Sequence, residues 1–139
     1  TTPPYAHSYL LTAKQSADYQ DATGDGISPD DIGNAYEFSY QRTSSAYRWR
    51  VPYTGVSYQR GFDTNPLDQK GSFSYGYKEM WYLHTVQSKN QVAEFYISPR
   101  TDALGTGGID GGKPSPITIN DRSFKLDSIF FTASLKKIS

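Results

Sequence analysis

The chain has 139 residues and carries 14 basic and 14 acidic side chains, so its formal net charge at neutral pH is zero. One domain is expected at this length. The neutral balance argues against a nucleic-acid binder and against attachment to a membrane through a polybasic patch. Without cysteine, no disulfide, thiolate nucleophile or cysteine-based zinc site is possible. No apolar run approaches the roughly 18 residues that span a bilayer, so membrane insertion is not expected.

The composition favours an all-β fold. Twelve tyrosines, seven phenylalanines and two tryptophans stand beside twelve glycines and eight prolines, as is typical of strands joined by turns. We predict a two-sheet antiparallel sandwich, of jelly-roll or Greek-key type, with about eight strands and long loops. Residues 1–7 are predicted to be an extended linker and residues 8–139 a single domain. The chain starts without a methionine or a signal peptide, so we expect it to be part of a longer protein.

The first predicted strand covers residues 9–13, and an acidic loop follows it. Residues 36–41 and 47–51 then alternate aromatic and polar side chains, which is the period of a half-buried strand. We predict that these two strands form a hairpin across residues 43–46. In the second strand, Arg48 and Arg50 are expected on the face opposite Tyr47 and Trp49.

The acidic loop, residues 21–31, concentrates oxygen ligands. In the frame of an EF-hand loop, Asp21, Thr23 and Asp25 stand at positions 1, 3 and 5, and Gly26 is the glycine of the sharp turn. A glutamate is missing from position 12, which implies a shortened loop. Calcium tolerates such variation because it accepts about 6–8 oxygens in flexible geometry. The predicted calcium ligands are Asp21, Thr23, Asp25, the Ile27 carbonyl, Asp30 and Asp31, with either Asp30 or Asp31 as the distal carboxylate.

A solvated turn is the alternative for the same loop, because glycine and aspartate are also common turn residues. The charge density favours a bound cation. Five aspartates lie between residues 18 and 31, where no lysine or arginine occurs.

Residues 52–71 are predicted to form a long ordered loop. In this loop, aromatic and polar residues no longer alternate as they do in a strand. Three of its aromatic side chains are therefore candidates for stacking on a sugar or a peptide: Tyr53, Tyr58 and Phe62. Anchoring of the loop against the core explains the same residues.

A second hairpin is predicted from residues 79–86 and 92–97, in a register that places Val86 opposite Ala93. We expect both of its strands to be covered on both faces. The last strands are predicted at residues 117–119 and 124–133. Ile129, Phe130 and Phe131 make the final strand apolar enough to belong to the core.

Enzyme signatures are weak. Residues 107–113 have the spacing of a phosphate-binding loop that ends at Lys113. The next residue is Pro114, where such a loop requires a serine or threonine to bind magnesium and then a helix, and proline permits neither. No Gly-x-Ser-x-Gly elbow is present. We therefore expect a protein that is not an enzyme.

Several segments together resemble a β-rich segment of very large, modular secreted bacterial proteins. They are Tyr9–Thr12, Asp21–Gly26, Tyr47–Tyr53, Glu79–His84, Ala93–Ser98 and Lys125–Ile129. The acidic loop separately resembles half of a dockerin or EF-hand calcium loop and departs from it after Gly26. The resemblance implies a secreted or cell-surface location and a modular context. It implies no activity.

The resulting expectation is a calcium-stabilised structural or adhesive module of a larger secreted protein. Its partners would be neighbouring domains of that protein, a glycan or another surface protein. A carbohydrate-binding module and an accessory part of a secreted hydrolase are the alternatives.

Overall fold

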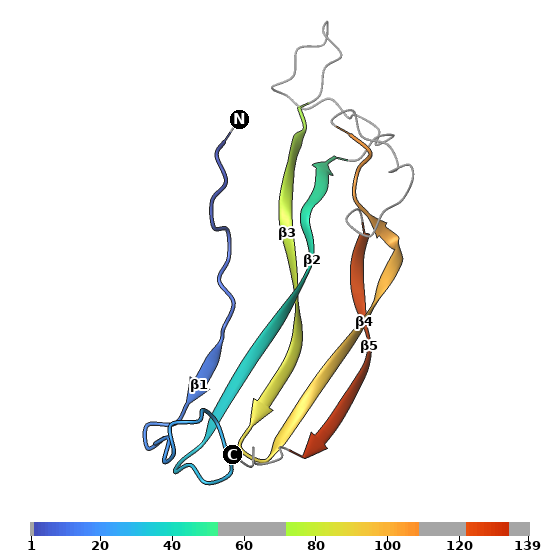
Figure 1. Ribbon diagram of the computed structural model, residues 1–139. Coiled ribbons are helices and arrows are strands. Elements are labelled where there is room, and N and C mark those ends of the chain that lie inside the picture. The colour runs from blue at the N-terminus through green and yellow to red at the C-terminus, as the bar shows by residue number, and fades with distance from the viewer. Residues whose placement is uncertain (1, 53–71, 109–121, 134–139) are drawn as a thin grey trace, which may run out of the picture. The chain divides into compact units, whose positions relative to one another are not determined.

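The computed structural model describes residues 2–52, 72–108 and 122–133. These residues form one antiparallel sheet of five strands. The strands are β1 (Ala13–Gln15), β2 (Ala35–Val51), β3 (Ser74–Ser88), β4 (Gln91–Leu104) and β5 (Arg122–Ala133). Each is hydrogen-bonded to the next along the chain, in the order β1-β2-β3-β4-β5 (Figure 1). Within this part of the chain there is no helix, and thus none that could cross a membrane.

The chain divides into two compact units, and the four long strands contribute to both. Unit 1 comprises Thr1–Gln41, Tyr82–Ile97 and Leu126–Ser139. Unit 2 comprises Arg42–Trp81 and Ser98–Lys125. Unit 1 therefore holds β1, the acidic loop and the turn between β3 and β4.

The predicted all-β class is confirmed, but the described residues form fewer and longer strands than expected. The predicted hairpin across residues 43–46 is wrong, because β2 runs through this segment without a break. The physical reason is that Thr43-Ser44-Ser45-Ala46 contains no glycine, proline, asparagine or aspartate to stabilise a turn. The predicted strand at residues 117–119 lies outside the described residues. One sheet is seen where a two-sheet sandwich was predicted.

The short strand β1 begins later than predicted. It pairs with the start of β2, with Ala13 opposite Glu37 and Gln15 opposite Ala35. Just before it, the Thr12 carbonyl accepts a hydrogen bond from the Phe38 amide at 2.8 Å. The backbone of this segment thus follows β2, although regular pairing starts only at Ala13.

The hairpin of β3 and β4 confirms the predicted register, since Val86 lies opposite Ala93. Its strands are longer than predicted, and β4 continues through Pro99 to Leu104. Proline does not end the strand because its fixed φ is compatible with an extended backbone.

Burial in the sheet is low. Among the described residues, Ala35 is the one buried hydrophobic side chain. The prediction that Ile129, Phe130 and Phe131 belong to the core is wrong, because all three are exposed. They lie on β5, the last strand of the sheet, and no second sheet of described residues packs against it. Phe130 packs edge-to-face on Tyr96 at a centroid distance of 5.4 Å, which covers only part of its ring.

Candidate metal centre

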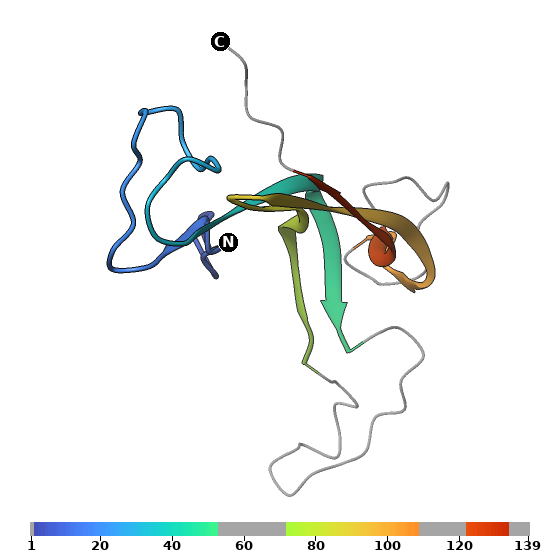
Figure 2. The ribbon, with the colours of Figure 1, turned by 90° about the horizontal axis from the view of Figure 1, so that it is seen from below.

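The acidic loop connects β1 to β2 (Figures 1 and 2). Backbone hydrogen bonds hold its two ends together. Gln20 and Ile32 form an isolated antiparallel bridge, in which each amide donates to the other's carbonyl at 3.0 Å. Below this bridge, the Ser16 amide donates to the Asn34 carbonyl at 2.8 Å. Residues 21–31 therefore form a loop that is closed by these two paired segments, residues 16–20 and 32–34, which we call the neck.

Asp21 organises the first half of the loop. Its Oδ1 accepts the amides of Gly24 at 2.6 Å and Thr23 at 3.3 Å, and its Oδ2 accepts the amide of Gly26 at 3.1 Å. Gly24 and Gly26 adopt φ values of +74° and +92°, which glycine reaches without the steric cost of a side chain. The chain therefore wraps around the carboxylate of Asp21.

Asp31 closes the second half of the loop. Only 4% of its surface is exposed, and its carboxylate accepts the amides of Ser28 at 2.8 Å and Ala22 at 3.2 Å. The Tyr19 hydroxyl donates to the same carboxylate at 3.1 Å. Hydrogen bonds from the Ser28 amide first, and from Ala22 and Tyr19, hold the pKa of Asp31 below its usual value. Asp31 is therefore a carboxylate at neutral pH. Partial burial and this carboxylate raise the pKa of Tyr19 to about 12, so its hydroxyl remains a donor.

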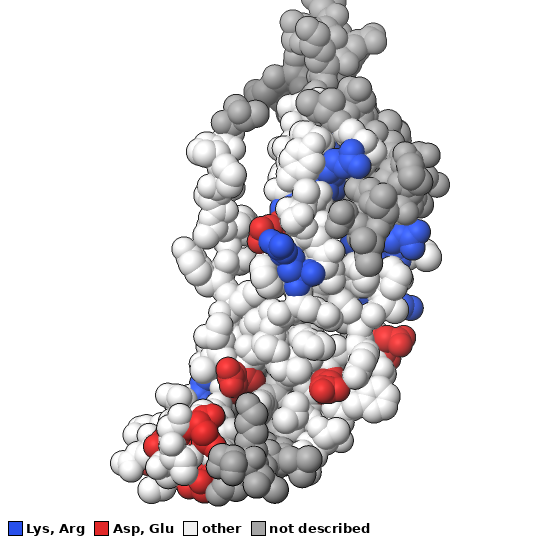
Figure 3. All heavy atoms as spheres, in the orientation of Figure 1, with Lys and Arg blue, Asp and Glu red and all other residues white. Residues whose placement is uncertain are grey.

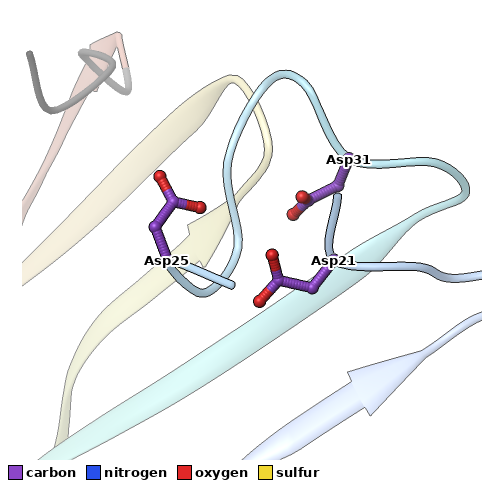
Figure 4. Close-up of side chains that lie close together, drawn as sticks. All are labelled: Asp21, Asp25 and Asp31. Atoms are coloured by element: carbon purple, nitrogen blue, oxygen red, sulfur yellow. The ribbon is translucent and has the colours of Figure 1, made fainter. Parts of the chain in front are cut away.

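Asp25 completes a cluster with Asp21 and Asp31. One carboxylate oxygen of each residue lies within 4.8 Å of those of the other two, and Figure 4 shows the three side chains converging from different parts of the loop. Asp25 is exposed and accepts the Thr23 hydroxyl at 2.7 Å. In the view of Figure 3, acidic groups gather over this loop.

Two of the six predicted ligand residues have other partners. The Ile27 carbonyl accepts a hydrogen bond from Gln87 Nε2 of β3 at 3.2 Å. The Asp30 carboxylate accepts the Ser28 hydroxyl at 2.6 Å and does not belong to the three-carboxylate cluster. The Thr23 hydroxyl lies beside the cluster through its bond to Asp25. The cluster thus contains Asp31 rather than Asp30 as the distal carboxylate.

The donor set fits a hard divalent cation. Calcium binds oxygens at about 2.3–2.6 Å, so two ligands on opposite sides of the ion lie roughly 4.6–5.2 Å apart. The carboxylate separations of up to 4.8 Å match this span. No ion pair of the described residues involves Asp21, Asp25 or Asp31, so a bound cation would offset the mutual repulsion of the three charges.

The hairpin of β3 and β4 supports the loop, which the sequence did not predict. Besides the bond from Gln87 to Ile27, the Lys89 ammonium donates to the backbone carbonyl of Asp31. Nothing local in the sequence indicates either contact, because Gln87 and Lys89 are more than fifty residues away from their partners. The three predicted platform residues, Tyr53, Tyr58 and Phe62, lie outside the described residues.

Comparison of the chain with protein-family models, with curated proteins and with solved structures found no match.

Proposed function

We propose that the chain is a non-enzymatic β module of a larger secreted or cell-surface protein, and that calcium bound by the acidic loop stabilises it. The observation that carries the proposal is the convergence of Asp21, Asp25 and Asp31. In this proposal the ion cross-links the two halves of the loop, one organised by Asp21 and the other by Asp31. The role is structural or adhesive.

The contacts of the loop indicate how a bound ion would act on the sheet. Ser28, Asp31 and Ala35 are all buried, so the end of the loop and the start of β2 are among the best-packed parts of unit 1. Gln87 and Lys89 connect this region to the β3–β4 hairpin. An ion that fixes the loop would therefore also stabilise three strands of unit 1.

The exposed sheet supports the modular part of the proposal. A single sheet needs another layer to bury its apolar side chains, and a sandwich remains the packing that we expect for the complete module. We propose that neighbouring domains of the parent protein contribute to this cover.

Calcium binding is tested by thermal unfolding with calcium and with chelator. A weak extracellular-type site, with a dissociation constant near 10⁻⁴ to 10⁻³ M, gains about 0.6–2 kcal/mol from roughly 2 mM calcium. The melting temperature should rise by a few degrees, and magnesium should act less because it requires a more regular octahedral site. Identical melts with calcium and chelator, together with no heat on titration, would remove calcium from the proposal.

Asp25→Asn is the diagnostic variant. The Asp25 carboxylate accepts the Thr23 hydroxyl, whereas Asp21 and Asp31 also hold backbone amides. Asp25→Asn should therefore abolish the calcium effect without lowering the melting temperature in chelator, where the loss of one charge relieves repulsion within the cluster. Asp18→Asn removes the same charge nearby in the chain but lies outside the cluster, and this control should keep the full calcium response.

A further inference from the structure

One face of β2 and β3 in unit 2 combines arginines with aromatic rings. The guanidinium carbon of Arg50 lies 4.2 Å from the ring centroid of Phe73, and that of Arg42 lies 5.8 Å from the ring centroid of Trp81. Both distances are within the range of cation–π attraction. Within unit 2, these contacts place even-numbered residues of β2 on the same face as the odd-numbered residues Phe73, just before β3, and Trp81, on β3.

Contacts on the opposite face agree with this assignment. Lys78 lies 5.3 Å from the ring centroid of Tyr47, and the Trp49 ring lies against Gly76, where a Cβ atom would approach it to 3.1 Å. These residues have the opposite parity on both strands. Since side chains alternate along a strand, Arg48 and Tyr77 belong with Arg42 and Trp81. We call this surface the arginine–aromatic face, formed by Arg42, Arg48, Arg50, Phe73, Tyr77 and Trp81.

Its rings are accessible. Tyr77 is 61% exposed, Phe73 45% and Trp81 44%. Tyr77 also packs edge-to-face on Tyr75, at 5.6 Å and 73°. Phe73 lies just before β3, and half-buried Tyr75 and exposed Tyr77 follow at intervals of two residues, so the three side chains lie along one extended segment. Accessible aromatic rings along an extended segment are suited to an extended ligand with partly apolar faces.

The arginines make the same face positive. Three guanidinium groups stand against one carboxylate, Glu79, which meets Arg42 at 3.5 Å in a half-exposed ion pair. The described residues of unit 2 as a whole include seven basic and two acidic side chains. Figure 3 shows basic groups over β2 and β3 in this unit. The planar guanidinium group matches a carboxylate through two parallel hydrogen bonds, and a ligand carboxylate would replace the long contact of Arg42 with Glu79.

We propose that the arginine–aromatic face binds an acidic polysaccharide, with sugar rings stacked on its aromatic rings and uronate carboxylates on the arginines. The ratio of aromatic rings to charged side chains on this face favours an acidic polysaccharide over nucleic acid. The face is richer in exposed rings than in net positive charge, whereas nucleic acid is bound mainly through many basic contacts to its phosphates. The proposal goes beyond the calcium-stabilised module and does not depend on it.

The test compares polygalacturonate with the same polymer after methyl esterification, which keeps the sugar rings and removes the charge. Affinity electrophoresis and calorimetry are run in chelator, so that calcium cross-links neither polymer nor protein. Binding to the ester should be at least about tenfold weaker, because the charge-assisted hydrogen bonds are lost. Equal binding to both polymers, or binding to neither, overturns the proposal. Tighter binding to oligothymidylate than to polygalacturonate assigns the face to nucleic acid and also overturns it.

Variants locate the site. Arg42→Gln and Tyr77→Ala should each weaken binding to polygalacturonate by at least about fivefold, and Arg42→Lys should recover only part of the loss, because lysine lacks the planar fork. Lys14→Gln and Tyr36→Ala make matched changes on exposed strand residues of unit 1 and should bind as the unchanged chain does. A purely structural role of the arginines would lower the melting temperature of Arg42→Gln and leave its affinity unchanged, and that result contradicts the proposal.

Discussion

Single residues of the acidic loop have two separable roles. Asp21 and Asp31 hold backbone amides in place and would shape the loop with or without an ion. The carboxylate of Asp25 contributes negative charge to the cluster and accepts a side-chain hydroxyl. This difference follows from hydrogen-bond geometry, because the three residues have the same chemistry. A loss of stability after substitution of Asp21 or Asp31 would therefore say little about metal binding.

Gly33 lies in the neck of the acidic loop, next to the bridge of Gln20 and Ile32, and it has little room for a side chain. Its φ is +77°, and a Cβ atom would lie 2.8 Å from the backbone nitrogen and Cα of Tyr19. Gly33→Ala should therefore lower the free energy of unfolding by more than the roughly 1–2 kcal/mol that a left-handed conformation alone costs an L residue. The measurement is urea unfolding in chelator.

Gly24→Ala is the matched control for this prediction. Gly24 has a similar φ of +74°, but a Cβ atom there would meet nothing within 4 Å. Gly24→Ala should therefore lower the free energy of unfolding only by the roughly 1–2 kcal/mol that the left-handed conformation costs. Equal losses at the two positions would show that the close contact with Tyr19 does not constrain the neck.

At the scale of elements, the β3–β4 hairpin and the acidic loop stabilise each other. Lys89 stands at the turn of the hairpin and donates to the Asp31 carbonyl, while Gln87 donates to the Ile27 carbonyl from the end of β3. Both acceptors lie in the half of the loop that departs from the EF-hand pattern. The hairpin therefore contributes the support that a longer calcium loop would obtain from its own residues.

Lys89→Met should weaken this support. Methionine keeps an unbranched chain and removes the donor, so the free energy of unfolding should fall by about 0.5–1.5 kcal/mol, and amide exchange at Ala22 and Gly26 should become faster. Hydrogen exchange followed by NMR measures both effects. Lys14→Met, the same change on the exposed strand β1, should leave these amides as they were, and an equal acceleration in the two variants would argue against a specific role of Lys89.

For the whole molecule, zero net charge coincides with many exposed apolar side chains. Large hydrophobic residues are exposed on β2, β3, β4 and β5, and β5 has a neighbour on one side only among the described strands. An apolar edge strand can pair with other chains, and a protein without net charge has little repulsion to prevent this.

We therefore expect reversible self-association near the sequence pI of about 6.6, which should decrease as the pH is raised to roughly 9. Phe131→Lys, on an edge-strand side chain that is 73% exposed, should reduce association at the lower pH. Tyr9→Lys adds the same charge at an exposed residue outside the strands and should reduce it less. Dynamic light scattering measures both. Equal scattering by the two variants would exclude β5 as the contact.

Local patterns in the sequence were enough to predict the β class and the register of the second hairpin, and they singled out Asp21 and Asp25, two of the three carboxylates that cluster in the loop. The patterns are the alternation of side chains, the turn residues and the spacing of Asp21, Asp25 and Gly26. Other features emerged only from the folded chain. The merging of two predicted strands into β2, the exposure of Phe131 and the support of the loop by Lys89 depend on which segments meet. An apolar strand can have the same sequence in a protein core or at the edge of a sheet. Its pattern indicates a preference for burial, but the rest of the fold decides whether a second layer is present to bury it.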